Sequence, residues 1–389
     1  MSHSLLLPDA TGQVTRYQVG QPLSFQPNPA GPRSRVAYAA AHVVADPLAP
    51  VDPWLDSAVD WDRTLDYRRH LWRLGFGVAE AMDTAQRGMG LDWPTSLELI
   101  RRSIDASRDF PNARVASGCG TDHLSVDECR SVDDVIRAYE SQMAAIEQLG
   151  GRLIIMASRA LAAHAQSPDD YARVYDHLLS QAREPVILHW LGEMFDPALA
   201  GYWGYADADR AMDVCLDVIQ RHADKVDGIK ISLLDASKEI AMRNRLPDGV
   251  KMYSGDDFNY PELIAGDEHG HSHALLGIFD AIAPAAAAAL AALDDGDLDN
   301  YHKIFAPTLP LARHVFAAPT RFYKTGVVFL AYLNGHQDHF TMIGGQESAR
   351  STLHLTELFR LADQAGLLSQ PELAVQRMKQ VLATRGVEQ

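Results

Sequence analysis

A lysine inside an apolar run near the middle of the chain has the setting of a nucleophilic amine. Residues 226–232 read V-D-G-I-K-I-S, which is typical of a short buried strand, and Lys230 lies in its apolar part. Burial disfavours the charged form of a lysine. A neutral amine condenses with a ketone or aldehyde to form a Schiff base, so Lys230 is a candidate covalent catalyst. The alternative interpretation is a lysine that extends its ammonium group from a strand end into solvent.

A second apolar run, V-K-M-Y-S-G-D-D, ends in a glycine-acid turn. Enough chain lies between this turn and Lys230 for one helix and the second strand, so both strands would present their ends to the same space. Ser254 and Asp256 can hydrogen-bond substrate hydroxyls or the surroundings of the lysine, and Gly255 lies between them. Asp257 is explained without function as a cap of the next helix.

These groups need a scaffold that gathers the ends of several strands. Short apolar runs alternate with amphipathic stretches, and the candidate strands are 35–44, 75–83, 114–121, 151–158, 185–192, 226–232, 250–256 and 273–280. The segments between them have helical spacing; in 93–107, Pro94 and Thr95 suit a helix start. The alternation predicts an α/β protein with a (β/α)8 TIM barrel, whose active site lies at the carboxyl ends of the strands. A doubly wound open sheet is the alternative, but no G-x-G-x-x-G motif opens a helix.

The two ends of the chain depart from this rhythm. The first residues are rich in Pro, Gly and Ser, which indicates an N-terminal arm or a small hairpin. After Ile282 the strand signal disappears, and helices are expected in an alanine-rich segment and then at 297–318, 320–333, 346–365 and 370–385. We therefore expect an arm (1–34), a barrel catalytic domain (35–282) and a helical C-terminal extension (283–389).

Composition limits the classes of partner. The net charge of −16 argues against nucleic acid or an anionic membrane as the main partner. Cys119, Cys129 and Cys215 have no C-x-x-C spacing, which indicates a reducing compartment and no zinc module. The start of the chain has no signal-peptide pattern, and the alanine-rich segment is too short to span a bilayer. A cytoplasmic location without membrane contact is expected.

The lysine strand and the S-G-D-D turn, in this order and spacing, resemble the dihydrodipicolinate synthase/N-acetylneuraminate lyase family of class I aldolases. The resemblance implies a Schiff base at Lys230, a small carbonyl compound as substrate, no cofactor, and a homo-oligomer, either dimer or tetramer. In the fifth strand, His189 stands where family members usually carry a tyrosine that relays protons. An imidazole titrates near neutral pH and can do this work. A buried histidine without a catalytic role is the alternative.

Other strand ends offer groups for substrate binding. The family's G-T-T-G-E stretch, which holds the carboxylate of a 2-keto acid, corresponds here to D-T-A-Q-R-G, where Thr84 matches. Arg87 can bind an oxygen-rich substrate, or it is a solvated loop charge. Gly120 and Thr121 resemble the family's glycine-rich strand end, which permits close approach of a ligand. Arg159 replaces part of a T-P-Y-Y segment and can pair with a carboxylate or phosphate, or with an acid at a helix start.

A metal site is the competing interpretation of the strand ends. Side chains that bind metals fall at or near these ends, namely His42, Glu80, Asp83, Asp122, His123 and His189. Such a cluster can hold a divalent cation, and metal-dependent isomerases and hydrolases use this fold. No compact motif such as H-E-x-x-H supports it. The histidines at 269–273 precede the eighth strand and would face the opposite end of the barrel, as structural or surface residues.

The favoured interpretation is a Schiff-base-forming lyase, aldolase or dehydratase acting on a keto acid or keto sugar from carbohydrate breakdown. Lys230 would be the nucleophile and His189 the proton shuttle, with Thr84 and Ser254 or Asp256 positioning hydroxyls. The alternatives are a cofactor-free dehydratase or metal-assisted isomerase or hydrolase on the same barrel, and a sugar-binding barrel that has lost catalysis.

Overall fold

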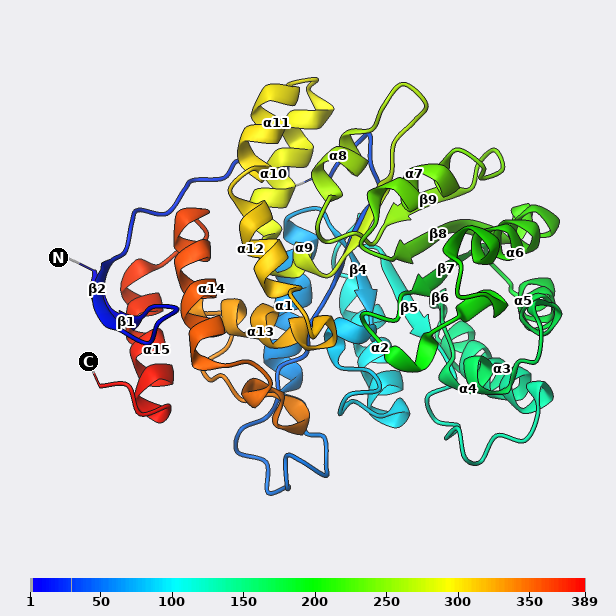
Figure 1. The fold of residues 1–389 in the computed structure, drawn as a ribbon, viewed down its shortest axis with the longest axis horizontal. Helices are drawn as coiled ribbons and strands as arrows, with labels where there is room; N and C mark the ends of the chain where they lie inside the picture. The colour runs from blue at the N-terminus through cyan, green and yellow to red at the C-terminus, as the bar shows by residue number, and fades with distance from the viewer. Residues whose placement is uncertain (1–2, 29, 389) are drawn as a thin grey trace.

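The computed structural model describes residues 3–28 and 30–388, and most of these residues surround a closed barrel of parallel strands (Figure 1). Around the barrel the strands follow the order β10, β3, β4, β5, β6, β7, β8 and β9. Their bounds are β3 (Ala37–Ala40), β4 (Gly77–Glu80), β5 (Val115–Cys119), β6 (Arg152–Met156), β7 (Val186–Leu191), β8 (Val226–Ser232), β9 (Lys251–Ser254) and β10 (His273–Leu276). Every strand lies within its predicted segment, so the predicted (β/α)8 barrel is confirmed.

Helices connect the strands and cover the outside of the barrel. They are α1 (Trp61–Arg73), α2 (Trp93–Ser107), α3 (Val132–Gln148), α4 (Arg159–His164), α5 (Pro168–Gln181), α6 (Ala208–Arg221), α7 (Ala236–Arg243), α8 (Tyr260–Ala265) and α9 (Ile278–Ala281). Helix α2 has the predicted bounds. It begins there because the Asp92 carboxylate accepts a hydrogen bond from Thr95 N at 2.9 Å and Pro94 occupies the first turn.

Two tyrosine rings fill the amino-terminal half of the barrel interior. Tyr38 and Tyr253 meet edge to face, with ring centroids 6.1 Å apart. The Tyr253 ring lies against Gly228, where a Cβ atom would approach it to 2.7 Å, and its hydroxyl donates to Asp227 Oδ2 at 2.7 Å. These rings leave the carboxyl-terminal half of the barrel for the inward-facing side chains of β7 and β8.

The N-terminal arm forms a small antiparallel hairpin of β1 (Ser4–Pro8) and β2 (Val14–Gln18). Figure 1 shows it beside the helices at the C-terminal end of the chain. The Tyr17 hydroxyl donates to Asp363 Oδ2 at 2.7 Å, and Gly20 N donates to the same carboxylate. The two ends of the chain are thus held together on one side of the barrel.

The C-terminal extension is helical, as predicted. Its helices are α10 (Ala283–Asp294), α11 (Leu298–Phe305), α12 (Thr308–Val315), α13 (Tyr323–Leu333), α14 (Thr352–Gln364) and α15 (Pro371–Thr384). The single helix predicted at 297–318 is wrong. It is two helices, because Pro307 has no N–H with which to continue the first. Helix α13 packs against α9 and against the short 3-10 helix η1 (Asp83–Ala85) that follows β4.

Within residues 3–28 and 30–388, no helix is both long and apolar enough to cross a lipid bilayer. Cys119, Cys129 and Cys215 are buried and form no disulfide.

Candidate active site

Lys230 points into the carboxyl-terminal half of the barrel from β8. Its side chain is 7% exposed and lies next to His189 of β7 in the strand register. Burial lowers the pKa of the amine, while the negative charges of Asp83 and Asp257 act in the opposite direction. Lys230 therefore loses its proton more readily than a lysine in water, and the neutral amine is the nucleophilic form.

Gly255 provides the space that the lysine side chain occupies. A Cβ atom on Gly255 would lie 2.9 Å from Lys230 Cε and 2.4 Å from both Ser232 Oγ and Ile231 O. Ile231 O is a backbone atom of strand β8, so it cannot move away without bending the strand. Glycine at this position is thus a requirement of the site's geometry.

We expect Gly255→Ala to lower the free energy of unfolding by about 1–3 kcal/mol, because overpacking of a well-packed interior has costs of this size. Urea denaturation measures the loss. Gly120→Ala is the matched control, since its Cβ atom would meet the flexible end of Met156 at 3.1 Å and Asp122 Oδ1 at 3.6 Å. Equal losses in the two variants would show that the space beside Lys230 is not tight.

His189 is a buried, neutral imidazole beside the lysine. It is 2% exposed, and its Nε2 atom lies 3.3 Å from Ser232 Oγ. Burial, reinforced by the positive charge of Lys230, holds the pKa of His189 well below its usual value. The ring therefore stays neutral at neutral pH, where it can donate or accept a hydrogen bond but does not titrate.

Asp257 has the acid-base properties that the sequence analysis attributed to histidine. It is 3% exposed, and burial raises the pKa of its carboxyl group to about 7, although the nearby Lys230 charge acts to lower it. Ile278 N donates a hydrogen bond to its Oδ1 atom at 2.8 Å. A carboxyl group that titrates near pH 7 can take up and release protons during turnover. In the sequence, Asp257 reads as a helix cap, and no local pattern indicates its raised pKa.

The two polar residues before Asp257 are held in other contacts. Asp256 accepts hydrogen bonds from Phe258 N and Asn259 N at 2.9 and 3.1 Å, so its carboxylate stabilises the turn. Ser254 is fully buried, and its hydroxyl donates to Glu239 Oε2 of α7 at 3.1 Å. Ser254 thus faces the helix layer, and neither residue lines the cavity described below.

Glu239 itself is a buried acid whose ionisation should govern the pH dependence of stability. Burial raises its pKa from 4.5 to about 8. The folded state therefore holds this proton more tightly than the unfolded state does, and the resulting stability is fully present below about pH 4.5 and lost as the pH rises through about 8.

We expect Glu239→Gln to be more stable than the wild type at pH 8 by a few kcal/mol and to show a flatter profile of unfolding free energy between pH 5 and 8. Urea unfolding across this range tests it, with the exposed Glu262→Gln as control; parallel profiles for Glu239→Gln and the wild type would contradict it.

The loop after β4 is fastened to its surroundings. Thr84 Oγ1 shares a hydrogen bond of 2.7 Å with the hydroxyl of Tyr323 at the start of α13. Gln86 has a left-handed backbone, and its side-chain amide donates to Ile343 O at 2.6 Å. Arg87 is buried rather than solvated: its guanidinium donates to both carboxylate oxygens of Asp122, at 2.7 and 3.0 Å, and to Gly118 O at 2.6 Å.

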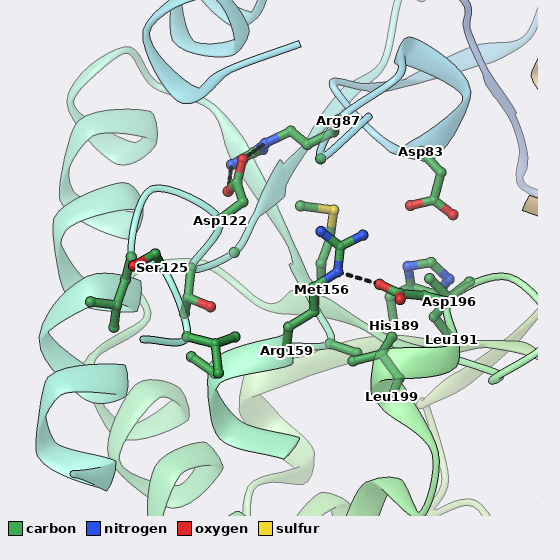
Figure 2. Close-up of a pocket in the computed structure, with 17 residues that line it drawn as sticks. Asp83, Arg87, Asp122, Ser125, Met156, Arg159, His189, Leu191, Asp196 and Leu199 are labelled. Carbon is green, nitrogen blue, oxygen red and sulfur yellow. Dashed lines mark hydrogen bonds and ion pairs between the residues drawn. The ribbon is translucent and has the colours of Figure 1, made fainter. Parts of the chain in front are cut away.

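A cavity of about 190 Å3 opens at the carboxyl ends of β5, β6 and β7 (Figure 2). Of the predicted site residues, His189, Arg87, Gly120, Thr121 and Arg159 line it, and Asp83 and Asp122 do so as well. Thr121 Oγ1 lies 2.6 Å from Ser158 Oγ. Arg159 pairs through Nε with Asp196 Oδ2 at 2.5 Å, and Figure 2 shows its guanidinium directed toward the middle of the cavity.

The C-terminal extension contributes two residues that the sequence analysis missed. Tyr323 is buried. Its ring stacks on Phe316, and its hydroxyl is hydrogen-bonded to Thr84. Lys324 is 2% exposed, and burial lowers its pKa to about 8 while Asp83 and Asp196 of the cavity act to raise it. The signal for Lys324 was the same as that for Lys230, a lysine next to an apolar run.

Three of the six residues of the metal interpretation are held by other partners. His42 Nδ1 lies 2.8 Å from Asp280 Oδ2, Glu80 pairs with Arg68, and Asp122 pairs with Arg87. No group of three or more His, Cys, Asp or Glu side chains within the described part of the chain is arranged to hold a metal ion. Nothing in the geometry of these side chains therefore favours a metal-dependent isomerase or hydrolase.

A family model described as "Protein of unknown function (DUF993)" matches residues 5–387. No curated protein matches the chain in sequence.

Several solved structures share the fold at low sequence identity. YagE from E. coli K12, described as a prophage protein of the dihydrodipicolinic acid synthase family in complex with pyruvate, is 15% identical, has a TM-score of 0.66, and is matched over 86% of this chain and 99% of its own. Dihydrodipicolinate synthase from Aquifex aeolicus is 11% identical with a TM-score of 0.63, over 86% and 99%. The pyruvate complex of the Acinetobacter baumannii enzyme is 14% identical with a TM-score of 0.63, over 86% and 100%. The resemblance to this family is thus confirmed at the level of the fold.

Proposed function

The chain belongs to the DUF993 family, and from its site we propose that it is a Schiff-base-forming lyase or aldolase with Lys230 as the nucleophile. One observation carries the proposal: a buried amine with a lowered pKa at the carboxyl end of the barrel, on which the charges of Asp83 and Asp257 act. Active sites of this fold lie at that end of the strands. Lowered amine pKa values are also characteristic of Schiff-base lysines.

The chemistry follows from the groups around the amine. The neutral Lys230 amine attacks a substrate carbonyl carbon to form a carbinolamine, which takes up a proton on its hydroxyl group and loses the carbonyl oxygen as water to give an iminium. The iminium accepts an electron pair when a neighbouring C–H or C–C bond breaks, so the developing carbanion becomes a neutral enamine. This lowers the barrier to C–C cleavage or to loss of a hydroxyl group as water.

Four residues are assigned supporting roles. Asp257, with its pKa near 7, transfers the proton between the carbon next to the iminium and solvent. His189, which is neutral, hydrogen-bonds the substrate oxygen as it leaves. Tyr323 and Thr84 share a hydrogen bond that holds the first residue of α13 against the loop after β4, at one side of the cavity.

The substrate is proposed to be a keto acid or keto sugar from carbohydrate breakdown. Pyruvate occupies the E. coli K12 and A. baumannii structures, and both proteins share this fold. Support for such a small ligand comes from the size of the cavity, about 190 Å3. Exposed large apolar side chains in the loop between β3 and α1, at Leu48, Trp54 and Leu55, support assembly into a homo-oligomer.

Borohydride trapping tests the proposal. The protein is incubated with a panel of keto acids and keto sugars, reduced with borohydride, and analysed by intact mass and peptide mapping. We expect one adduct per chain, on Lys230, for at least one compound. The absence of any adduct on Lys230 across the panel would reject the Schiff-base mechanism, and tight sugar binding without turnover would then favour a binding protein.

A further inference from the structure

Asp83 lies in the cavity on the side of His189, the strand neighbour of Lys230. It lies in the 3-10 helix η1 and lines the cavity, and Figure 2 shows its carboxylate directed toward the His189 ring. Its negative charge acts on the amines of both Lys230 and Lys324. Because His189 is the neighbour of Lys230 in the strand register, a compound that reaches Lys230 from this cavity passes beside the Asp83 carboxylate.

The other charged residues that line the cavity neutralise one another. Arg87 pairs with Asp122 at 2.7 Å, and Arg159 pairs with Asp196 at 2.5 Å. Among the described residues, none forms an ion pair with the Asp83 side chain. Beside His189 the lining thus presents an acid with no ion-pair partner among the described residues, while Arg159 uses only its Nε atom in its ion pair and directs its terminal nitrogens toward the middle of the cavity.

The groups nearby that would otherwise bind a carboxylate are already engaged. The Thr84 hydroxyl is hydrogen-bonded to Tyr323, and the Gln86 amide donates to the carbonyl groups of Ile343 and Met89. A carboxylate on the carbon next to the reacting carbonyl would thus meet the like charge of Asp83, with the hydroxyl and amide donors of this loop already occupied. Like charges in a partly dehydrated site repel strongly.

Hydroxyl groups suit the same surroundings. A carboxylate has two oxygens and can accept hydrogen bonds from hydroxyls on adjacent carbon atoms. Across the cavity, His189 and Thr121 offer further polar atoms, while Met156 and Leu191 provide an apolar surface for C–H groups. This combination of one acid, neutral polar groups and an apolar wall is complementary to an uncharged polyhydroxylated compound.

We propose that the substrate is a neutral keto or aldehyde sugar rather than a 2-keto acid, and that Asp83 is the residue that makes this selection. The inference rests on the proposed Schiff base at Lys230 and narrows the class of compound that forms it. In the trapped product, the carbonyl oxygen leaves as water and hydride from borohydride adds to the imine carbon. A secondary amine then links the sugar carbon to Lys230.

The test compares compounds of matched size in the trapping reaction. Dihydroxyacetone and pyruvate each have three carbon atoms, and D-fructose and 2-keto-D-gluconate each have six. We expect the neutral member of each pair to label Lys230 of the wild type at least about tenfold more efficiently, a ratio equivalent to about 1.4 kcal/mol. Asp83→Asn keeps the size of the side chain and removes its charge, and it should lower this ratio about tenfold or more. Asp62→Asn, on the exposed face of α1, should leave the ratio unchanged.

The outcomes separate this inference from the proposed function. If pyruvate and 2-keto-D-gluconate label wild-type Lys230 as well as the sugars do, the Schiff base stands and the substrate class is wrong. An unchanged ratio in a folded Asp83→Asn protein, checked by thermal unfolding, rejects Asp83 as the selecting residue. If no compound of either class labels Lys230, both proposals fail together.

Discussion

Replacing Lys230 with alanine is expected to abolish borohydride-trapped adducts without unfolding the protein. A Schiff base requires a primary amine. Lys230 lies beside His189 in the strand register, and the nearby Asp257 carboxyl group can transfer protons. Burial of an amine costs free energy, so its removal relieves a desolvation penalty while it leaves a small cavity. The two effects oppose each other, and the free energy of unfolding should change little. Intact mass after trapping and urea denaturation measure the two quantities.

Lys324 makes this test discriminating. It is a second buried lysine with a lowered pKa. The charge of Asp83 acts on it as on Lys230, so Lys324 would be the alternative nucleophile. Lys324→Ala should retain the adduct, whereas Lys230→Ala and the length-matched Lys230→Met should both lose it. The exposed Lys303→Ala controls for nonspecific labelling. An adduct that persists in both Lys230 variants and maps to Lys324 would move the chemistry to the C-terminal extension.

The barrel was predictable because each strand is buried on both faces and reads as a short apolar run. Apolar character reports burial, however, and not strand pairing. The run predicted at 35–44 contains a strand only at Ala37–Ala40, yet Val43 and Val44 beyond the strand are equally buried. The extension was predictable as helices for the same reason. Its break at Pro307 needed the backbone chemistry of proline in addition to periodicity.

The site was predictable only for residues whose position follows from the order of the strands and from the alternation of inward- and outward-facing side chains along each strand. Lys230 and His189 lie on adjacent strands and both point inward, which their order in the sequence implies. The choice between Asp256 and Asp257 depends on how the chain turns after the strand ends, and the S-G-D-D sequence does not show which acid turns toward the lysine. The contact between Tyr323 and Thr84 depends on how α13 packs on the barrel, so no local pattern could reveal it.

Asp257→Asn should slow proton exchange next to the reacting carbonyl by a factor of about 10²–10⁴, the usual contribution of a positioned acid-base group. The compound captured in the trapping experiment is incubated with enzyme in D2O, and deuterium incorporation at the neighbouring carbon is followed by NMR. Exchange breaks only the C–H bond next to the iminium and needs no C–C or C–O cleavage, so it isolates the step assigned to Asp257. Schiff-base formation itself should persist, because Lys230 is unchanged.

The pH profile gives this prediction its sign. The pKa of Asp257 is about 7, and the base is the ionised form, so exchange by the wild type should rise with pH through about 7 and then level off. Asp257→Asn has no ionisable group at this position and should lose that rise. Asp248→Asn removes one negative charge from an exposed loop before β9, at the amino-terminal end of the barrel, and should retain it. An Asp257→Asn protein with the wild-type rate and profile would show that another group removes the proton. Asp83, the other carboxylate whose charge acts on Lys230, would then be the next candidate base to replace.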